Sequence, residues 1–65
     1  MILVNEIRVK YEVLIQLDEK KIDAKYFDSS TVAKEFTEAY NRRMPGIPIT
    51  PGSEATYNGA FPLDG

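Results

Sequence analysis

Few side chains in this 65-residue chain could perform chemistry, because the sequence contains neither histidine nor cysteine. General acid–base catalysis most often uses histidine, and nucleophilic catalysis needs a serine, threonine or cysteine beside a base. Ser29 and Ser30 lie in a short polar run, Ser53 lies among glycines and prolines, and the carboxylates are spread along the chain. The common zinc sites need thiolate or imidazole ligands. We therefore expect no enzymatic activity, no cofactor and no bound metal.

Two polar clusters could instead bind a ligand directly. Residues 28–31 (DSST) could hold a phosphate at a helix N-terminus. No glycine-rich loop or adjacent lysine accompanies them, so helix capping is the better interpretation. Residues 40–43 (YNRR) could contact nucleic acid, but solvation of a helix end is the simpler interpretation.

Length and charge narrow the classes of function. A chain of 65 residues forms one domain at most, and a domain of this size buries only about 60% of its unfolded surface. No disulfide can stabilise it, so stability must come from packing, self-association or a partner. The formal net charge of −2 differs from that of a general nucleic-acid binder, which is normally basic.

The apolar run at residues 1–4 is far too short for a signal peptide or a membrane span. The lack of cysteine also fits a reducing compartment. We therefore expect a cytoplasmic protein with no membrane partner.

Glycine and proline divide the chain into two parts. All four prolines and all four glycines lie between Pro45 and Gly65, and residues 1–44 contain neither. Because both residue types interrupt helices and strands, we expect a compact body over residues 1–44 and an extended C-terminal arm over residues 45–65. Asn58-Gly59 predicts a turn within the arm, which could form a small hairpin of residues 56–57 with residues 60–61.

Apolar and polar residues alternate over residues 7–17, which indicates a half-buried strand. After a charged turn the alternation resumes over residues 22–26. With residues 19–20 at the tip of the turn, all the apolar alternates share one face, which fixes the register of a hairpin. The predicted cross-strand pairs are Leu17 with Ile22, Ile15 with Ala24, and Val13 with Tyr26. A longer loop at the same register is an alternative, because the turn lacks the favoured Asn-Gly or Asp-Gly pair.

A helix is expected over residues 30–43, where residues 28–31 offer a choice of N-caps. Its apolar residues form one stripe, which should cover the apolar face of the hairpin. The members of this stripe are Val32, Phe36, Ala39, Tyr40 and Met44. The Met44-Pro45-Gly46 sequence would end the helix.

Residues 1–4 are apolar throughout and are interpreted as a separate first strand, with the start of one long bent strand as the alternative. The predicted fold is therefore α+β, with a small antiparallel two- or three-stranded sheet packed on one α-helix in the order β-β-β-α. Residues 7–17 would be the central strand, and the extended arm would follow the helix.

One stretch of residues 10–36 has a wider resemblance. It contains a strand, a charged turn, a strand that ends in Phe27, the polar cap at residues 28–30, and a helix carrying Ala33 and Phe36. This pattern resembles the small arm-binding domains of phage tyrosine-recombinase integrases and the related ethylene-response-factor domain of plants. The resemblance implies a three-stranded sheet on one helix, with the sheet face opposite the helix in the DNA major groove.

Carried onto this sequence, that face combines four cations with three anions. The cations are Arg8, Lys10, Lys21 and Lys25, and the anions are Glu6, Glu12 and Asp23. A face that displaces counterions from phosphates is usually more basic, and the tryptophans common in the plant family are absent here. Sequence-specific DNA binding is therefore the alternative function rather than the first.

The same face also presents two apolar residues, Leu14 and Phe27, as diagonal neighbours ringed by charge. This arrangement is typical of a small protein interface with a polar rim. Exposure without function, or cover by the C-terminal arm, would also explain it. The arm itself is rich in apolar residues and should dock on its own body, on a second copy, or on the sheet edge of a partner.

We therefore expect a small non-enzymatic protein-binding module, of the kind that phages and mobile elements use as accessory or inhibitor proteins against a host protein. The partner is most simply another protein, with DNA or a second copy of the chain as alternatives. The candidate partner-binding residues are Arg8, Lys10, Leu14, Lys25 and Phe27 on the sheet face and Tyr57 and Phe61 in the arm.

Overall fold

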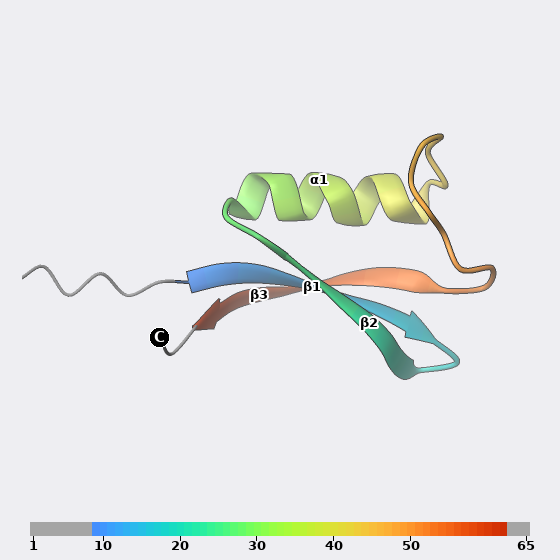
Figure 1. Cartoon of the computed structure of the whole chain (residues 1–65), viewed down its shortest axis with the longest axis horizontal. Coiled ribbons are helices and arrows are strands. Elements are labelled where there is room, and N and C mark those ends of the chain that lie inside the picture. The colour runs from blue at the N-terminus through green and yellow to red at the C-terminus, as the bar shows by residue number, and fades with distance from the viewer. Residues whose placement is uncertain (1–8, 63–65) are drawn as a thin grey trace, which may run out of the picture.

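The computed structural model describes residues 9–62 as three strands and one helix. In chain order these are β1 (Val9–Leu17), β2 (Lys20–Phe27), α1 (Ser30–Asn41) and β3 (Glu54–Pro62). The strands form an antiparallel sheet in the order β2-β1-β3, and α1 lies on one of its faces (Figure 1). The expected α+β class, with a small antiparallel sheet packed on one helix, is confirmed.

The third strand follows the helix instead of preceding it. β3 comes from the segment expected as an extended arm, and it pairs along the whole of β1 from Val9↔Pro62 to Gln16↔Glu54. β1 is therefore central, as predicted, but the order β-β-β-α was wrong. The hairpin expected at Asn58-Gly59 was also wrong, since both residues lie inside β3. The strand expected over residues 1–4 lies outside the described residues.

The β1–β2 turn lies one residue earlier than expected. Its tip is Asp18-Glu19, both with positive φ (51° and 66°), and Leu17 pairs with Lys20. Two central residues with positive φ characterise the type I′ turn, whose twist matches that of the flanking strands. Asp and Glu adopt this conformation here although neither has the freedom of glycine.

A bulge at Ile22 changes the face on which the rest of β2 lies. Gln16 pairs with Lys21 but Ile15 pairs with Asp23, so Ile22 is the extra residue. An inserted residue reverses the facing of every side chain beyond it. Because of the earlier turn and this bulge, the predicted pairs of Leu17 with Ile22, Ile15 with Ala24 and Val13 with Tyr26 were all wrong. The observed pairs beyond the bulge are Ile15↔Asp23, Leu14↔Ala24, Val13↔Lys25, Glu12↔Tyr26 and Tyr11↔Phe27.

The helix begins as predicted but turns a different side to the sheet. Ser29 is the N-cap, and its hydroxyl accepts a hydrogen bond from the Val32 N–H at 3.4 Å. The buried residues are Ala33 and Tyr40, with Phe36 partly buried between them. Val32 and Met44, expected in the stripe, are about half exposed at 49% each. The small Ala33 side chain lets α1 approach the sheet closely, and the larger Val32 lies beside that contact.

The helix ends at Asn41, with Arg43 in the left-handed conformation at φ 57°. The Arg43 N–H donates to the Tyr40 carbonyl, and the Met44 N–H donates to the Ala39 carbonyl. This pair of bonds is the Schellman motif, which usually has glycine at the left-handed position. The Arg43 guanidinium donates to the Ser53 carbonyl at 2.6 Å, so its side chain ties the helix end to the start of β3.

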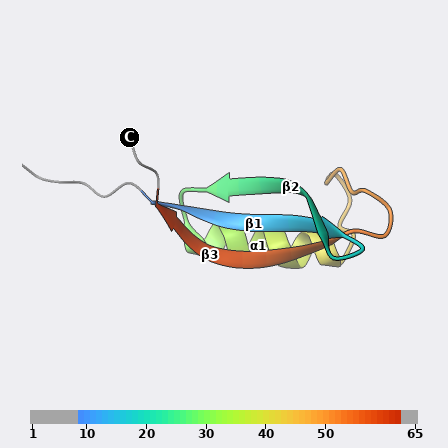
Figure 2. The same ribbon diagram turned by 90° about the horizontal axis from the view of Figure 1, so that it is seen from below.

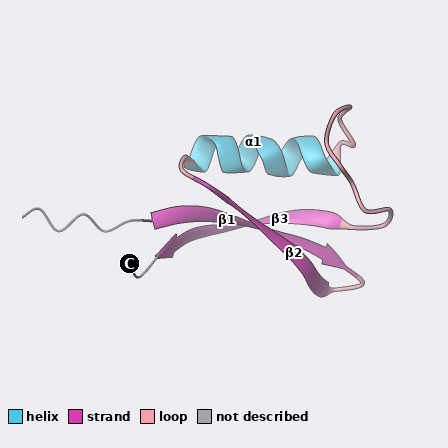
Figure 3. Ribbon diagram, in the orientation of Figure 1, coloured by secondary structure: helices cyan, strands magenta, loops and turns pink. Residues whose placement is uncertain are grey.

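The core lies between the sheet and α1, and it is small. Its buried apolar residues are Val13, Ile15, Ala33, Tyr40 and Ala55. α1 packs mainly on β3, with fewer contacts to β1 and β2, so most of β2 lies beside the helix and not under it (Figure 2). The loop of residues 42–53 runs from the C-terminal end of α1 to the start of β3 (Figure 3). There the Tyr40 hydroxyl contacts the Ser53 hydroxyl at 2.5 Å and accepts from the Thr50 N–H.

Candidate protein-binding surfaces

The sheet face opposite α1, here called the open face, is covered by no described element (Figure 1). Strand alternation and the register place ten side chains on it. They are Lys10, Glu12, Leu14, Gln16, Lys21, Ala24, Tyr26, Glu54, Thr56 and Phe61. A hydrogen bond from Thr56 to Gln16 at 3.2 Å agrees with this assignment.

A buried carboxylate lies at the centre of the open face. Glu12 is only 4% exposed, although it lies on the side of the sheet away from the core. One of its oxygens accepts from the Tyr26 hydroxyl at 2.7 Å, and the other accepts from the Asn58 amide at 2.6 Å. These two hydrogen bonds, first that of Tyr26 and then that of Asn58, hold the pKa of Glu12 below its ordinary value of 4.5.

Both hydrogen-bond donors to Glu12 reach it because of bulges. The Ile22 bulge places Tyr26 on the open face, opposite Glu12. In β3 the register shifts between Glu12↔Gly59 and Val13↔Tyr57, so Asn58 is the extra residue. Gly59 next to it has φ of +88°, which favours glycine. Bulges commonly redirect side chains in this way. Here one bulge in β2 and one in β3 direct Tyr26 and Asn58 toward the same carboxylate.

An exposed aromatic pair lies over this carboxylate. The rings of Tyr26 and Phe61 meet edge to face, with their centroids 5.6 Å apart. They come from the two outer strands and reach each other across β1, yet they remain 45% and 41% exposed. Leu14, half-buried, lies one position further along the same face of β1. The open face therefore has an apolar centre that is held in a fixed geometry.

The charges of the open face are largely compensated. Lys10 forms an ion pair and hydrogen bond with Asp28 at the end of β2. Glu12 is satisfied by its two donors. Lys21 pairs with Gln16, so it also lies on this face, and its positive charge lowers the pKa of Glu12 further.

The structure brings only some of the candidate binding residues together. Lys10, Leu14 and Phe61 share the open face, whereas Arg8 lies outside the described residues. Lys25 and Phe27 lie on the other face, because the Ile22 bulge reverses their direction. Their expected position on the open face was therefore wrong.

Two of the candidate aromatic residues, Phe27 from β2 and Tyr57 from β3, lie on the helix side of the sheet. Phe27 packs on Phe36 of α1 with ring centroids 5.1 Å apart. Tyr57 also faces α1, where its ring is 5.4 Å from the Lys34 ammonium. Neither ring belongs to the open face. Tyr26, Glu12 and Asn58 take the central places there, and nothing in the sequence pattern marked the bulges that bring them together.

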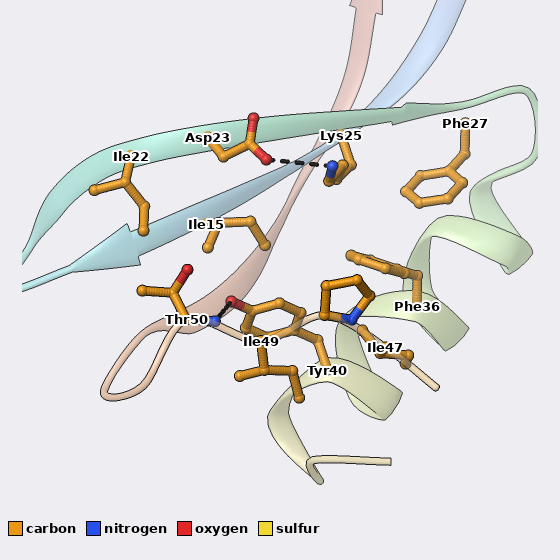
Figure 4. Close-up of a pocket in the computed structure, with 11 residues that line it drawn as sticks. Ile15, Ile22, Asp23, Lys25, Phe27, Phe36, Tyr40, Ile47, Ile49 and Thr50 are labelled. Atoms are coloured by element: carbon orange, nitrogen blue, oxygen red, sulfur yellow. Dashed lines mark hydrogen bonds and ion pairs between the residues drawn. The ribbon is translucent and has the colours of Figure 1, made fainter. Parts of the chain in front are cut away.

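A second candidate surface is a groove of about 660 Å³ between β2, α1 and residues 47–50 (Figure 4). It exists because α1 packs mainly over β3 and contacts the helix-side face of β2 around Phe27, leaving the rest of that face open. Its apolar walls are Ile22 and Phe27 from β2, Phe36 from α1, and Ile47 and Ile49 from the loop. Asp23 and Lys25 form an ion pair at its margin, 3.3 Å apart.

Residues 9–62 contain no group of three or more His, Cys, Asp or Glu side chains that could hold a metal ion. Within the same range, no helix has the length and apolar character needed to cross a membrane. Comparison with protein-family models found no match, and comparisons with curated proteins and with solved structures found no significant match. Function is therefore argued from the two surfaces.

Proposed function

We propose that this chain is a small non-enzymatic protein-binding module, whose open face contacts the partner protein. The observation that carries the proposal is the exposed Tyr26–Phe61 pair above the buried Glu12. Tyrosine and other aromatic residues are enriched at the centres of protein interfaces, surrounded by polar residues that exclude water. Because Glu12 fixes the Tyr26 hydroxyl before binding, less side-chain entropy is lost on association.

The open face also indicates the chemistry of the partner. Its centre is apolar, formed by Leu14, Tyr26 and Phe61. Its rim carries the lysines Lys10 and Lys21 and one exposed carboxylate, Glu54, so lysine is in excess. A complementary surface would present an apolar contact flanked by carboxylates. Lys10 already has Asp28 as a partner, so Lys21 is the stronger determinant of this charge preference.

DNA binding through the same face has less support. Phosphate recognition needs cations that are free to replace counterions, whereas Lys10 is paired with Asp28. The carboxylate of Glu12 at the centre of the face would also repel phosphate. A DNA-binding face would give an affinity for duplex DNA that falls steeply as the salt concentration rises.

The proposal is tested with a pair of matched substitutions. A tagged chain is used to capture proteins from cell extract, and each captured protein is purified and titrated against the chain directly. Phe61→Asp should weaken the interaction by at least about tenfold, the loss typical of a central interface residue. Val32→Asp, which places the same charge at a similarly exposed residue on α1, should leave it unchanged.

Circular dichroism establishes that both variants keep the fold. Equal affinities for Phe61→Asp and the unsubstituted chain would contradict the proposal. Salt-sensitive retardation of duplex DNA in a gel, lost on Lys21→Gln, would favour the DNA-binding alternative instead.

A further inference from the structure

The outer edge of β2 is available for another strand. Among the described strands, β2 pairs only with β1, so its other edge has no neighbour. The Ala24 N–H donates to the side chain of its own neighbour, Asp23 Oδ1, at 2.8 Å on the protein surface. This N–H therefore points away from β1, and in an antiparallel ladder the backbone of Tyr26, two residues on, points the same way. Such an edge is a template for strand addition.

The edge of β3 is held by another element, whereas at Ala24 only the exposed side chain of Asp23 occupies the N–H, and an incoming strand would displace it. The Asn41 side chain donates to the Ala55 carbonyl at 2.9 Å and accepts from the Ala55 N–H at 2.7 Å. Asn41 thus occupies both backbone groups of Ala55 from the last turn of α1. Of the two outer strands, β2 is the one whose edge lies beyond the reach of the helix (Figure 2).

The groove lies beside this edge. A strand added to β2 would continue the sheet, and every second side chain would then project toward the side of α1. On that side lie Ile22, Phe36, Ile47 and Ile49, which line the groove (Figure 4). Backbone hydrogen bonds along an edge and pockets for alternate side chains together characterise recognition by strand addition.

Charge identifies the kind of strand that fits. β2 contains three lysines, Lys20, Lys21 and Lys25, and one acidic residue, Asp23. Opposite charges directly across a strand pair stabilise it, and like charges destabilise it. Lys25 is already ion-paired with Asp23, so the excess positive charge lies at Lys20 and Lys21, and an incoming strand should be acidic. A second copy of β2 would bring the same excess of lysine to the edge.

We propose that the β2 edge and the adjoining groove bind an extended acidic segment of a partner protein. The segment would add as a strand to residues 24–26, beyond the Ile22 bulge, with apolar residues at alternate positions seated in the groove. This site uses the backbone edge of β2 and the helix side of the sheet, whereas the function proposed above uses side chains on the opposite face, so the inference does not depend on that function.

The probe for this site is a capped heptapeptide in which isoleucine and glutamate alternate. A scrambled peptide of the same composition tests the need for alternation, and a version with lysine in place of glutamate tests the charge. Titrations into the full chain are followed by backbone amide shifts and hydrogen exchange. The alternating peptide should slow exchange at Ala24 and Tyr26, and the lysine version should bind at least about tenfold more weakly.

Two variants test whether the peptide binds in the groove beside β2. Ile22→Glu, in the wall of the groove, should weaken peptide binding at least about tenfold. Val32→Glu introduces the same charge at a side chain of similar exposure, 49% against 46%, and should leave binding unchanged. Amide exchange in the unsubstituted chain gives an answer that does not depend on how well either variant folds.

Three results would overturn the inference. The first is unchanged exchange at Ala24 and Tyr26 in saturating peptide, and the second is a response confined to the open face around Leu14 and Thr56. The third is protection of Ala24 that rises with protein concentration alone and accompanies dimers in sedimentation, because the edge would then serve a second copy. Loss of partner binding in Phe61→Asp leaves this site untouched, so the two proposals fail separately.

Discussion

The hydroxyl of Tyr26 lies 2.7 Å from a carboxylate oxygen of Glu12, directly across the β1–β2 pair. The contact exists only because Ile22 is an extra residue in β2, which places Tyr26 on the open face and Phe27 on Phe36. One bulge thus supplies both a hydrogen bond on the outer face and an aromatic contact in the core. The predictions below test these two consequences and the geometry of the helix end.

Tyr26→Phe should raise the pKa of Glu12 toward its ordinary value of 4.5, because the Tyr26 hydroxyl is the main group that lowers it. The variant should also unfold at a lower denaturant concentration, since one oxygen of a buried carboxylate loses its donor. The Glu12 side chain can be titrated by NMR. Tyr57→Phe is the matched control, because the Tyr57 hydroxyl makes no hydrogen bond within residues 9–62, and it should leave the titration unchanged.

Glu12 should also give the protein a dependence on acid. A carboxyl with a lowered pKa in the folded state stabilises the fold above its unfolded pKa, and the stabilisation disappears as the pH falls through the folded value. The free energy of unfolding should therefore fall as the pH drops below about 4.5. Glu12→Gln should be less stable at neutral pH and should fall less steeply with acid.

Asp23 has a lowered pKa as well, held by the Ala24 N–H first and then by Lys25. Asp23 is present in both the unsubstituted protein and the Glu12→Gln variant. The difference between their urea-unfolding curves as the pH changes therefore reports the contribution of Glu12 alone. A gap between the two proteins that stays constant across the acid range would contradict the prediction.

Phe27 and Phe61 should differ in their contribution to stability. Phe27→Ala removes a ring packed on Phe36 and partly buried against the core, and should lower the free energy of unfolding by about 2 to 3 kcal/mol. Phe61→Ala removes a ring that is 41% exposed, and its effect should be clearly smaller. Denaturant unfolding measures both. The opposite ranking would place Phe27 on the surface and remove the bulge from the fold.

The left-handed Arg43 allows its backbone and side chain to be separated. Arg43→Ala and Arg43→Gly lose the same contacts with Ser53 and Tyr40. Glycine alone adopts φ of 57° without strain, so the glycine variant should be more stable than the alanine variant by about 1 kcal/mol. Thermal or denaturant unfolding measures the difference. Equal stability of the two variants would show that the Schellman turn at the helix end is not maintained.

Much of the fold could be predicted because its main signals are local. The alternation in β1 is carried by consecutive residues, and the Ser29 cap lies directly before the helix. Hydrophobic alternation also located the β1–β2 hairpin to within one residue at its turn. Each of these features depends on the type and spacing of neighbouring residues, which a single sequence contains.

The positions of the side chains on the sheet could not be predicted, because bulges depend on contacts between distant residues. Ile22 is an ordinary strand residue, and only the packing of Phe27 on α1 and of Tyr26 on Glu12 favours its insertion. Asn58-Gly59 gave a correct signal of positive φ at Gly59. That signal is common to a hairpin turn and a bulge, and the pairing of β3 with β1 decides between them.

The helix stripe shows a related limit. Val32 is more hydrophobic than Ala33, so a pattern of apolar residues favours Val32 as the buried position. Close approach to a sheet favours a small side chain, and Ala33 is the residue that is fully buried. Side-chain size therefore decides which side of this helix is buried, and hydrophobicity does not. The limit on size is set by the sheet, whose residues lie elsewhere in the sequence.

The position of β3 after the helix has a consequence for how the protein is made. While a ribosome is still adding residues 54–62, the β1–β2 hairpin and α1 are already synthesised, yet the far edge of β1 has no companion. Pairing of Val9 with Pro62 closes almost the whole described chain into a single loop, a slow kind of step in folding. Until residues 54–62 are added, the nascent chain therefore exposes a second unpaired strand edge, which β3 occupies in the finished fold.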